Sequence, residues 1–253
     1  MTYPFSPAGD GEPVGPTPDA TSAGSRAAGG AGPGVPLSIW PGLPESGGTR
    51  DGASCGGPVT VAAARRVIDT FSVPGDLVAA AGGCSSAVAE AAAAAGRRVL
   101  ALVPDGSGGY PLPVPYPVAR LRPGGPALVL APGNPVTGQA ALAVAGCCSP
   151  GCCEASGQDD RDAGLLFAAC ERVLCPGGVL AVIAGPAADG GPLTDTAGSV
   201  VAAARAAGLV YAQHIVLVRA EIDGDRLAPA APGGSQVHDD LLVFTKPGGE
   251  ARS

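Results

Sequence analysis

The sequence predicts an α/β domain with a mostly parallel sheet covered by helices on both faces. Short apolar runs of strand length alternate with longer segments of helical periodicity, which is typical of this fold class. Glycine-containing turns follow several of the strand-like runs. The last two runs, residues 209–222 and 237–246, have no helical segment between them. This arrangement predicts an antiparallel hairpin at the C-terminal side of the sheet.

The first half of the chain predicts a helix, a strand, a second helix and a second strand. Apolar residues recur at helical spacing between residues 61 and 71. The run 77–81 suits a strand buried on both faces. The alanine-rich residues 87–95, closed by Gly96, favour a helix. Residues 99–103 form the next strand and complete a strand–helix–strand unit.

The second half continues the alternation. Residues 117–121 and 127–131 are expected to be the third and fourth strands, and residues 139–145 a short helix. The elements expected before the hairpin are a helix over 163–174, a fifth strand over 179–184 and a helix over 193–207. With the hairpin, the expected sheet has seven strands.

Composition divides the chain into an arm and a domain. Gly (41) and Pro (27) are dense before residue 56, while 46% of all residues are hydrophobic and the mean hydropathy is +0.28. A wholly disordered chain would be more polar. We therefore predict a flexible arm over 1–55, a domain over 56–247 and a disordered tail over 248–253. Trp40, the only Trp, either docks on the domain or is exposed in the arm.

Charge and hydropathy exclude some classes of partner. The formal net charge is -7, with 15 Lys+Arg against 22 Asp+Glu, so the chain lacks the basic face that binding to phosphates requires. The most apolar stretch, residues 126–148, is interrupted by Pro and polar residues and does not suit a membrane helix. The N-terminal residues do not look like a secretory signal, which predicts a cytoplasmic protein with reduced thiols.

Several stretches resemble the S-adenosylmethionine-dependent amino-methyltransferases of DNA and RNA. PGDLVAAAGGCSSAVAEA (74–91) is similar to their first motif, and CERVLCPGGVLAVI (170–183) to their PGG turn and the following strand. AAGLVYAQHIVLV (206–218) with VHDDLLVFTKP (237–247) resembles the C-terminal hairpin of actinobacterial members. LPESG (43–47) is similar to a segment that precedes the fold in those proteins.

The resemblance covers about residues 37–247 and implies a Rossmann-like methyltransferase fold that binds S-adenosylmethionine. In that fold the ligand lies beyond the carboxyl ends of the strands. Small residues after the first strand approach the methionine part of the cofactor, and an acidic residue after the second strand holds the ribose. The cofactor-binding residues implied in this way are Gly82, Gly83, Cys84, Ser85 and Asp105.

The catalytic motifs depart from the family pattern. The Asp-Pro of the first motif is replaced within Ala79–Ala81, and the acidic position of the second strand falls at about Val103. The family has an (Asp/Asn/Ser)-Pro-Pro-Tyr turn after its fourth strand, and the expected place for it, residues 128–138, offers only Asn134 as a catalytic residue. No aromatic residue follows Asn134 to stack on a base.

Two functions from different classes follow from this pattern. The first is a methyltransferase, with nucleic acid implied as substrate by the resemblance but disfavoured by the acidic charge. The second is a non-catalytic relative, a pseudoenzyme that keeps the fold as a scaffold and binds a protein partner. The residues themselves allow simpler interpretations, because Gly82-Gly83 also suits a strand-to-helix turn and Asp105 lies in a Pro-Asp-Gly turn.

A third, less favoured function is a metal or redox protein. Cys147, Cys148, Cys152 and Cys153 are close enough in sequence to suggest a soft metal, but adjacent cysteines do not easily face one ion. A loop of small residues is the favoured interpretation, and no metal site is predicted. His214 and His238 on the hairpin could bind metal or act as a base, although structural roles are favoured.

The cysteine-rich segment gives a first prediction. Under reducing conditions we expect the purified protein to contain no stoichiometric zinc or copper, and replacement of the four cysteines by Ser to leave its metal content unchanged. Elemental analysis of both proteins measures this. One equivalent of metal in the original protein, lost in the Ser variant, would establish the metal-binding function instead.

Overall fold

The computed structural model describes one compact unit that begins at Val35. The described residues are 35–41, 59–82, 85–104, 116–121, 128–130, 136–147, 160–185, 196–219, 221–223, 226–228 and 238–248. Residues 1–34 of the predicted arm and residues 249–253 of the predicted tail lie outside them.

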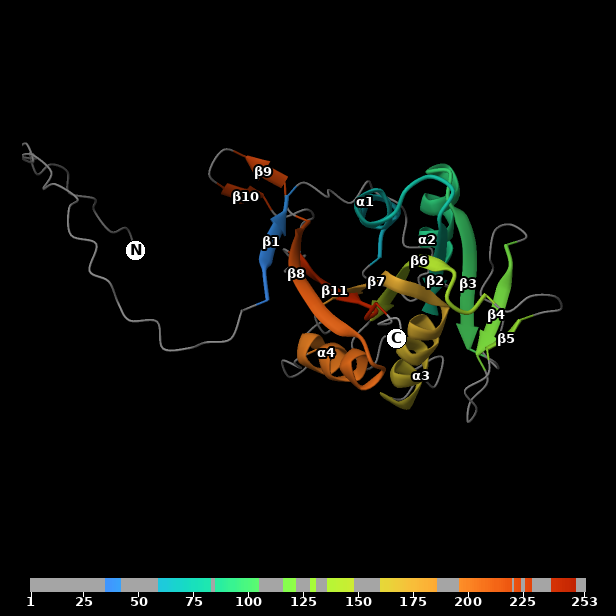
Figure 1. The fold of residues 1–253 in the computed structure, drawn as a ribbon. Coiled ribbons are helices and arrows are strands. Elements are labelled where there is room, and N and C mark those ends of the chain that lie inside the picture. Colours follow the sequence, from blue (N-terminus) through green and yellow to red (C-terminus); the bar gives the residue numbers. More distant parts are fainter. Residues whose placement is uncertain are drawn as a thin grey trace, which may run out of the picture. The chain divides into compact units, whose positions relative to one another are not determined.

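A single mixed sheet organises the described residues (Figure 1). Its nine strands lie in the order β1-β8-β11-β7-β6-β2-β3-β4-β5. The strands are β1 (Leu37–Trp40), β2 (Leu77–Ala81), β3 (Arg98–Pro104), β4 (Val118–Leu121), β5 (Leu128–Leu130), β6 (Ala140–Cys147), β7 (Leu174–Ala184), β8 (Val210–Val218) and β11 (His238–Thr245). A separate two-stranded ladder joins β9 (Glu221–Asp223) to β10 (Arg226–Ala228).

The sheet confirms the predicted fold class. Without the two outermost strands, β1 and β5, seven strands remain, which is the predicted number, although one of them, β6, was expected to be a helix. Six of these run in the same direction, and β11 runs against them, antiparallel to both of its neighbours, β7 and β8. The predicted C-terminal hairpin is therefore the β8–β11 pair. Its register shifts between Val243 and Phe244, where the ladder contains an irregularity.

Four helices cover the two faces of this sheet. Figure 1 shows α1 (Val61–Phe71) and α2 (Ser85–Ala94) on one side, with α3 (Asp160–Val173) and α4 (Thr196–Ala206) on the other. Two separate apolar clusters, one on each face, reproduce this division. The predicted helix over 61–71 is confirmed at both ends, and the Thr60 side chain caps it by accepting a hydrogen bond from the Ala63 amide (3.1 Å).

The centre of the sheet is built from small residues. All five residues of β2 are buried, and Ala79, Ala80 and Ala81 are fully so. Successive side chains of a strand point to opposite faces, so a strand buried on both faces must be apolar throughout. Alanine at these positions lets both helix layers approach the sheet closely. The large side chains of the core come mainly from the helices and from the flanking strands.

One predicted helix is wrong. Residues 139–145, expected to be a short helix, belong to β6, which lies between β2 and β7 at the centre of the sheet. The error has a physical cause: a short run of Ala, Leu and Val satisfies both helix propensity and the pattern of a doubly buried strand. Hydrogen bonding to strands on both sides decides between them.

The fourth predicted strand is also placed differently. Residues 128–130 do form a strand, β5, but it pairs antiparallel with β4 at the outer edge of the sheet. The strand that follows the third in parallel order is β6, on the other side of β2. β6 therefore takes the place in the parallel order that the sequence analysis assigned to residues 127–131.

Part of the predicted arm belongs to the sheet. Residues 37–40 form the parallel edge strand β1 beside β8. The Trp40 ring stacks on Phe71 of α1, with centroids 6.3 Å apart, and the Arg66 guanidinium lies 4.9 Å from the Trp40 centroid. Arg66 also donates a hydrogen bond to the Pro41 carbonyl (2.9 Å). Of the two alternatives for Trp40, the structure has the docked one.

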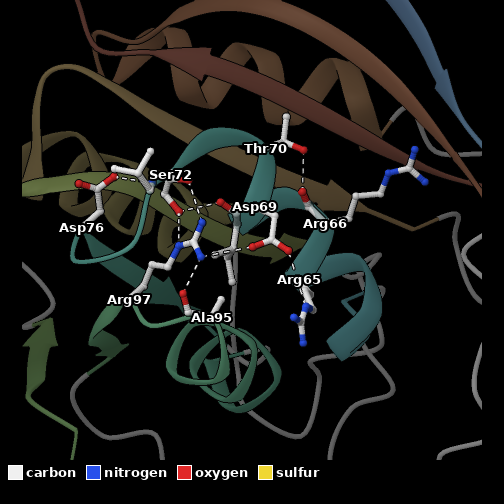
Figure 2. Close-up of polar contacts among 10 residues, drawn as sticks. Arg65, Arg66, Asp69, Thr70, Ser72, Asp76, Ala95 and Arg97 are labelled. Carbon is white, nitrogen blue, oxygen red and sulfur yellow. Dashed lines mark hydrogen bonds and ion pairs between the residues drawn. The ribbon is translucent and has the colours of Figure 1, made fainter.

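A polar clasp at the C-terminal end of α1 joins the first two helices (Figure 2). The Arg97 side chain, 8% exposed, donates to the Ser72 hydroxyl (3.2 Å), the Ser72 carbonyl (2.9 Å) and the Ala95 carbonyl. Its guanidinium also lies 3.3 Å from Asp69. Arg97 thus satisfies carbonyls at the C-terminal ends of both α1 and α2, next to the start of β3.

Replacement of Arg97 tests this clasp. We expect Arg97→Ala to lower the free energy of unfolding by about 2 kcal/mol, because charge-assisted hydrogen bonds in a nearly buried site are lost. Arg65→Ala is the matched control: that side chain is 59% exposed and pairs with Asp69 on the helix surface, so its loss should change stability by less than about 0.5 kcal/mol. Urea unfolding of both variants measures the difference, and equal losses would contradict the prediction.

Candidate functional site

Four parallel strands end at the same edge of the sheet, called here the carboxyl edge. The last residues of β2, β3, β6 and β7 are Ala81, Pro104, Cys147 and Ala184. Ala81 is in register with Leu102 of β3 on one side and with Ala145 of β6 on the other. From β2 the chain crosses to β3 in one direction, whereas β6 and β7 lie in the other. Such a reversal of strand order is where ligands bind in open α/β sheets.

The turn after β2 begins with a glycine in the left-handed backbone conformation. Gly82 directly follows the strand with φ at +75°, a conformation that side-chain-bearing residues rarely adopt. A Cβ atom at Gly82 would lie 3.4 Å from Cδ2 of Leu166 on α3. Helix α2 begins three residues later at Ser85, which is 1% exposed. The first turn of α2 contains no acidic residue, so the positive end of the helix faces the carboxyl edge without local neutralisation.

Of the five predicted cofactor residues, the structure describes the positions of Gly82 and Ser85. Gly82 and Ser85 lie together at the end of β2, as the sequence predicts. Gly83 and Cys84, between them, lie outside the described residues, as does Asp105. Asp105 directly follows β3 in sequence, and β3 is the parallel neighbour of β2.

The predicted catalytic position loses its structural basis. Asn134 was expected after the fourth parallel strand, on the assumption that residues 127–131 are that strand. The fourth strand is β6, and Asn134 precedes it in sequence. Asn134 itself lies outside the described residues, so its own placement stays untested.

In the resemblance described above the polar turn follows the fourth parallel strand, and the fourth parallel strand of this chain along the sequence is β6. The residues there are Cys148-Ser149-Pro150-Gly151-Cys152, which lie outside the described part of the chain. Ser149-Pro150 matches the first two residues of the (Asp/Asn/Ser)-Pro-Pro-Tyr pattern, and Gly151-Cys152 replaces its last two. The sequence analysis missed this match because it assigned the preceding strand to a helix. The segment does coincide with the unusual cysteine-rich run.

Buried polar side chains gather towards the carboxyl edge. Among the described residues the buried polar or charged side chains are Ser72, Ser85, Arg219 and Asp239. Ser72 belongs to the Arg97 clasp, whereas Ser85 follows β2 at the carboxyl edge. Arg219, just after β8, forms an ion pair with Asp239 near the start of β11. Since β8 runs parallel to β7, this pair also lies towards the carboxyl edge, three to four strands away from β2.

The histidine on the hairpin has a structural partner. His214 Nε2 lies 2.9 Å from the Asp240 carboxylate, across the β8–β11 pair. The nearby Tyr211 ring packs on Phe244, with centroids 5.2 Å apart. Burial raises the pKa of the Tyr211 hydroxyl, the Asp240 charge raises it further, and Arg205 lowers it. This set of side chains fastens β8 to β11.

The described residues place no metal centre or membrane span in the fold. They contain no group of three or more His, Cys, Asp or Glu side chains arranged to hold a metal ion. The cysteines that follow Cys147 lie outside them. None of the helices in the described part of the chain is long and apolar enough to cross a membrane.

The Gly82 turn gives a prediction about stability. Gly82→Ala forces a Cβ atom into the left-handed region, which should lower the free energy of unfolding by about 1–2 kcal/mol. Gly164→Ala in α3 is the control with the opposite sign: its Cβ would meet open space on a helical backbone, and the change should stabilise by about 0.5–1 kcal/mol. Chemical denaturation of the two variants would contradict this if both shifted in the same direction.

Comparisons with known proteins give structural neighbours but no family assignment. No family model matches the chain, and no curated protein matches it. The chain is similar to a TehB-like SAM-dependent methyltransferase from Corynebacterium glutamicum, with 18% identity, coverage of 74% of this chain and 88% of that one, and a TM-score of 0.41. It is also similar to 1,6-didemethyltoxoflavin-N1-methyltransferase from Burkholderia thailandensis, with 16% identity, coverage of 73% of this chain and 76% of that one, and a TM-score of 0.42. A SAM-dependent methyltransferase from Methanosarcina mazei is a further neighbour, with 11% identity, coverage of 72% of this chain and 97% of that one, and a TM-score of 0.43.

Proposed function

We propose that the chain binds S-adenosylmethionine at the carboxyl edge, where β2 meets β6, and transfers its methyl group to an amine. The observation that carries this proposal is the point in the sheet where the strand order reverses, between the parallel strands β2 and β6. The glycine turn at Gly82 lies directly after β2 at this point. The reversed last strand, β11, inserted between β7 and β8, is the further feature that agrees with the family resemblance of the sequence.

The residues at this turn suit the cofactor. The φ of +75° at Gly82 lets the backbone turn sharply directly after β2, at the edge where the ligand would lie. The start of α2 supplies backbone N–H groups at the same place, which favour a carboxylate such as that of the methionine part. The next strand, β3, is followed in sequence by Asp105, whose carboxylate would accept hydrogen bonds from the ribose hydroxyls.

The cofactor, when bound, supplies an electrophilic methyl group on a sulfonium centre. The chain's own task is to hold the acceptor in line with that group and to accept a hydrogen bond from its N–H. By the strand order, the turn after β6 is closest to this task, so Ser149 replaces Asn134 as the candidate catalytic residue. Gly83, Cys84 and Ser85 complete the cofactor turn in this proposal.

In this proposal the acceptor is a small molecule or a protein and not a nucleic acid. A net charge of -7 opposes binding to a polyanion, and the turn after β6 contains no aromatic residue for base stacking. We place the protein in the cytoplasm, where the cofactor and reduced thiols are both available.

A non-catalytic scaffold is the second candidate, and it has a specific observation in its favour. Ala81, which ends β2, is fully buried, and the end of β3 at Val103 and Pro104 carries no carboxylate. The chain therefore lacks an acidic residue at the end of β2, and at β3 its acidic residue, Asp105, follows the last residue of the strand. Under this alternative the fold binds a protein partner without turnover.

Calorimetric titration with S-adenosylmethionine, repeated with S-adenosylhomocysteine, tests the proposal. We expect micromolar binding, about -8 kcal/mol. Gly82→Val should abolish the heat, because a β-branched side chain at a positive φ displaces the turn. Gly96→Val is the matched control: its φ of +72° imposes similar strain in the turn that follows α2, away from the carboxyl edge. This variant should lose similar stability and keep its affinity.

Each outcome separates the alternatives. Binding that is lost only in the Gly82 variant supports the cofactor site and leads to an acceptor search, with release of S-adenosylhomocysteine as the measure of turnover. Binding without turnover for amines of any size would favour a regulatory protein that retains the ligand. The absence of heat from a protein whose circular dichroism shows it folded would exclude the cofactor site and favour the scaffold.

A further inference from the structure

The edge strand β1 carries no charge on its outer side. In the order of the described strands β1 is the last, and it pairs with β8 alone, as Figure 1 shows (blue). Residues 35–41 contain no charged side chain, and Pro36 and Pro41 enclose the strand. Folded proteins commonly protect an edge strand from pairing with other chains by charged side chains. β1 lacks that protection.

The backbone groups of β1 point alternately towards β8 and away from it. The Pro36 carbonyl accepts a hydrogen bond from the His214 amide of β8 (3.0 Å). Both backbone groups of a strand residue point to the same side, and successive residues alternate, so every second residue after Pro36 also faces β8. The N–H and C=O groups of Leu37 and Ile39 therefore point outward. These four groups have no partner among the described residues.

The side chains of the same two residues are exposed to solvent. Leu37 is 65% exposed and Ile39 is 64% exposed, whereas Trp40 packs against the apolar cluster of the α1/α2 face. Successive side chains of a strand lie on opposite faces, so Leu37 and Ile39 share the face that α3 and α4 cover. Two exposed aliphatic side chains beside a row of outward backbone groups form a template for the addition of another strand.

We propose that β1 pairs antiparallel with β1 of a second copy of the chain. The two-fold axis passes between the two Ser38 residues, perpendicular to the sheet. In this register Leu37 of each copy lies opposite Ile39 of the other, and each such pair exchanges two hydrogen bonds. Four hydrogen bonds then use every outward group of both strands. The four aliphatic side chains meet on one face, and the two-fold axis closes the assembly at two copies.

Self-complementarity is the reason to choose a second copy as the partner. Among registers that use only the residues of β1, this one alone pairs all four outward groups of each strand. A shift that places Leu37 opposite Pro41 loses hydrogen bonds, because proline has no N–H and the Pro41 carbonyl already accepts from Arg66 (2.9 Å). Each copy carries a net charge of -7, and a four-residue strand pair is smaller than a standard interface of about 800 Å² per partner. The dimer is therefore weak and reversible. The pairing needs no cofactor and does not rest on the proposed function.

Sedimentation equilibrium of the full chain, from about 10 μM to about 1 mM, tests the pairing in a range that suits weak association. The average mass should rise from that of one copy towards that of two. Ile39→Lys should raise the dissociation constant at least about tenfold, because a lysine on an edge strand opposes strand addition. Val73→Lys is the matched control: Val73, two residues after α1, is 63% exposed, so the variant adds the same charge and removes a similar apolar surface. Its dissociation constant should stay within about twofold of the original.

Hydrogen exchange identifies the atoms that pair. The amides of Leu37 and Ile39 should exchange more slowly at high protein concentration than at low, whereas those of Ser38 and Trp40, which face β8, should exchange equally at both. Trp40 emission checks that β1 remains docked in Ile39→Lys. If it does not, Ile39→Pro removes one outward N–H and keeps the bonds to β8.

Three results would overturn the inference. The first is a monomer at every concentration, including one in which the Leu37 and Ile39 amides are always protected, since their partner would then belong to the same chain. The second is a dimer that Ile39→Lys and Val73→Lys weaken equally. The third is a dimer whose formation leaves exchange at Leu37 and Ile39 unchanged, because the copies would then associate through another surface.

Discussion

Burial of the central strands on both faces is the constraint on which the rest of the structure depends. β2 and β6 lie between two helix layers, so each of their residues must pack against a helix or a neighbouring strand. Alanine fits this position because it allows close approach from both sides at little cost in side-chain entropy. Because the central strands contain so many alanines, the large side chains of the core come from the helices and from the flanking strands. Side chains such as Leu166, Phe167 and Ile68 then determine how close each helix lies to the sheet.

The small centre also fixes where polar chemistry can occur. A sheet that is apolar throughout leaves its edges as the places for hydrogen-bonding groups. At the opposite edge, where β2 and β3 begin, these groups form the polar clasp, in which Arg97 donates hydrogen bonds to the carbonyl groups at two helix ends. At the carboxyl edge the glycine turn leaves backbone groups accessible, and helix α2 presents its positive end. The two edges of one sheet thus divide stability from the proposed binding.

Most of the fold could be predicted from the sequence, and the two failures, β6 and β1, have different causes. The helix over 61–71 was predictable because its apolar residues follow a clear 3.6-residue period, and strand 77–81 because turns enclose a short apolar run. Strand β6 was not, since an alanine-rich run has no period that distinguishes a helix from a doubly buried strand. β1 escaped notice because four residues in a Gly/Pro-rich context give no signal until a neighbouring strand pairs with them.

The candidate site was predictable where it depends on local sequence. Gly82 and Ser85 follow a recognisable strand and lie where they were expected. The position of Leu166 beside Gly82 was not predictable, because it brings together residues 84 positions apart through the path of α3. Asn134 shows how one misassigned element moves an expected site: because β6 was predicted as a helix, the catalytic turn was sought before residue 140, whereas the fourth parallel strand ends at Cys147.

The docking of Trp40 also determines what tryptophan fluorescence can report. Trp40 is the only Trp in the chain, and it lies on an edge strand that is held by one neighbouring strand, Phe71 and Arg66. Its emission therefore reports on the attachment of that strand to α1, not on the alanine-built centre. An edge strand can detach while the central strands stay paired, since local opening requires less free energy than global unfolding. Fluorescence and far-ultraviolet circular dichroism thus observe different parts of this molecule, and comparing their transitions would measure how strongly the added strand is coupled to the sheet.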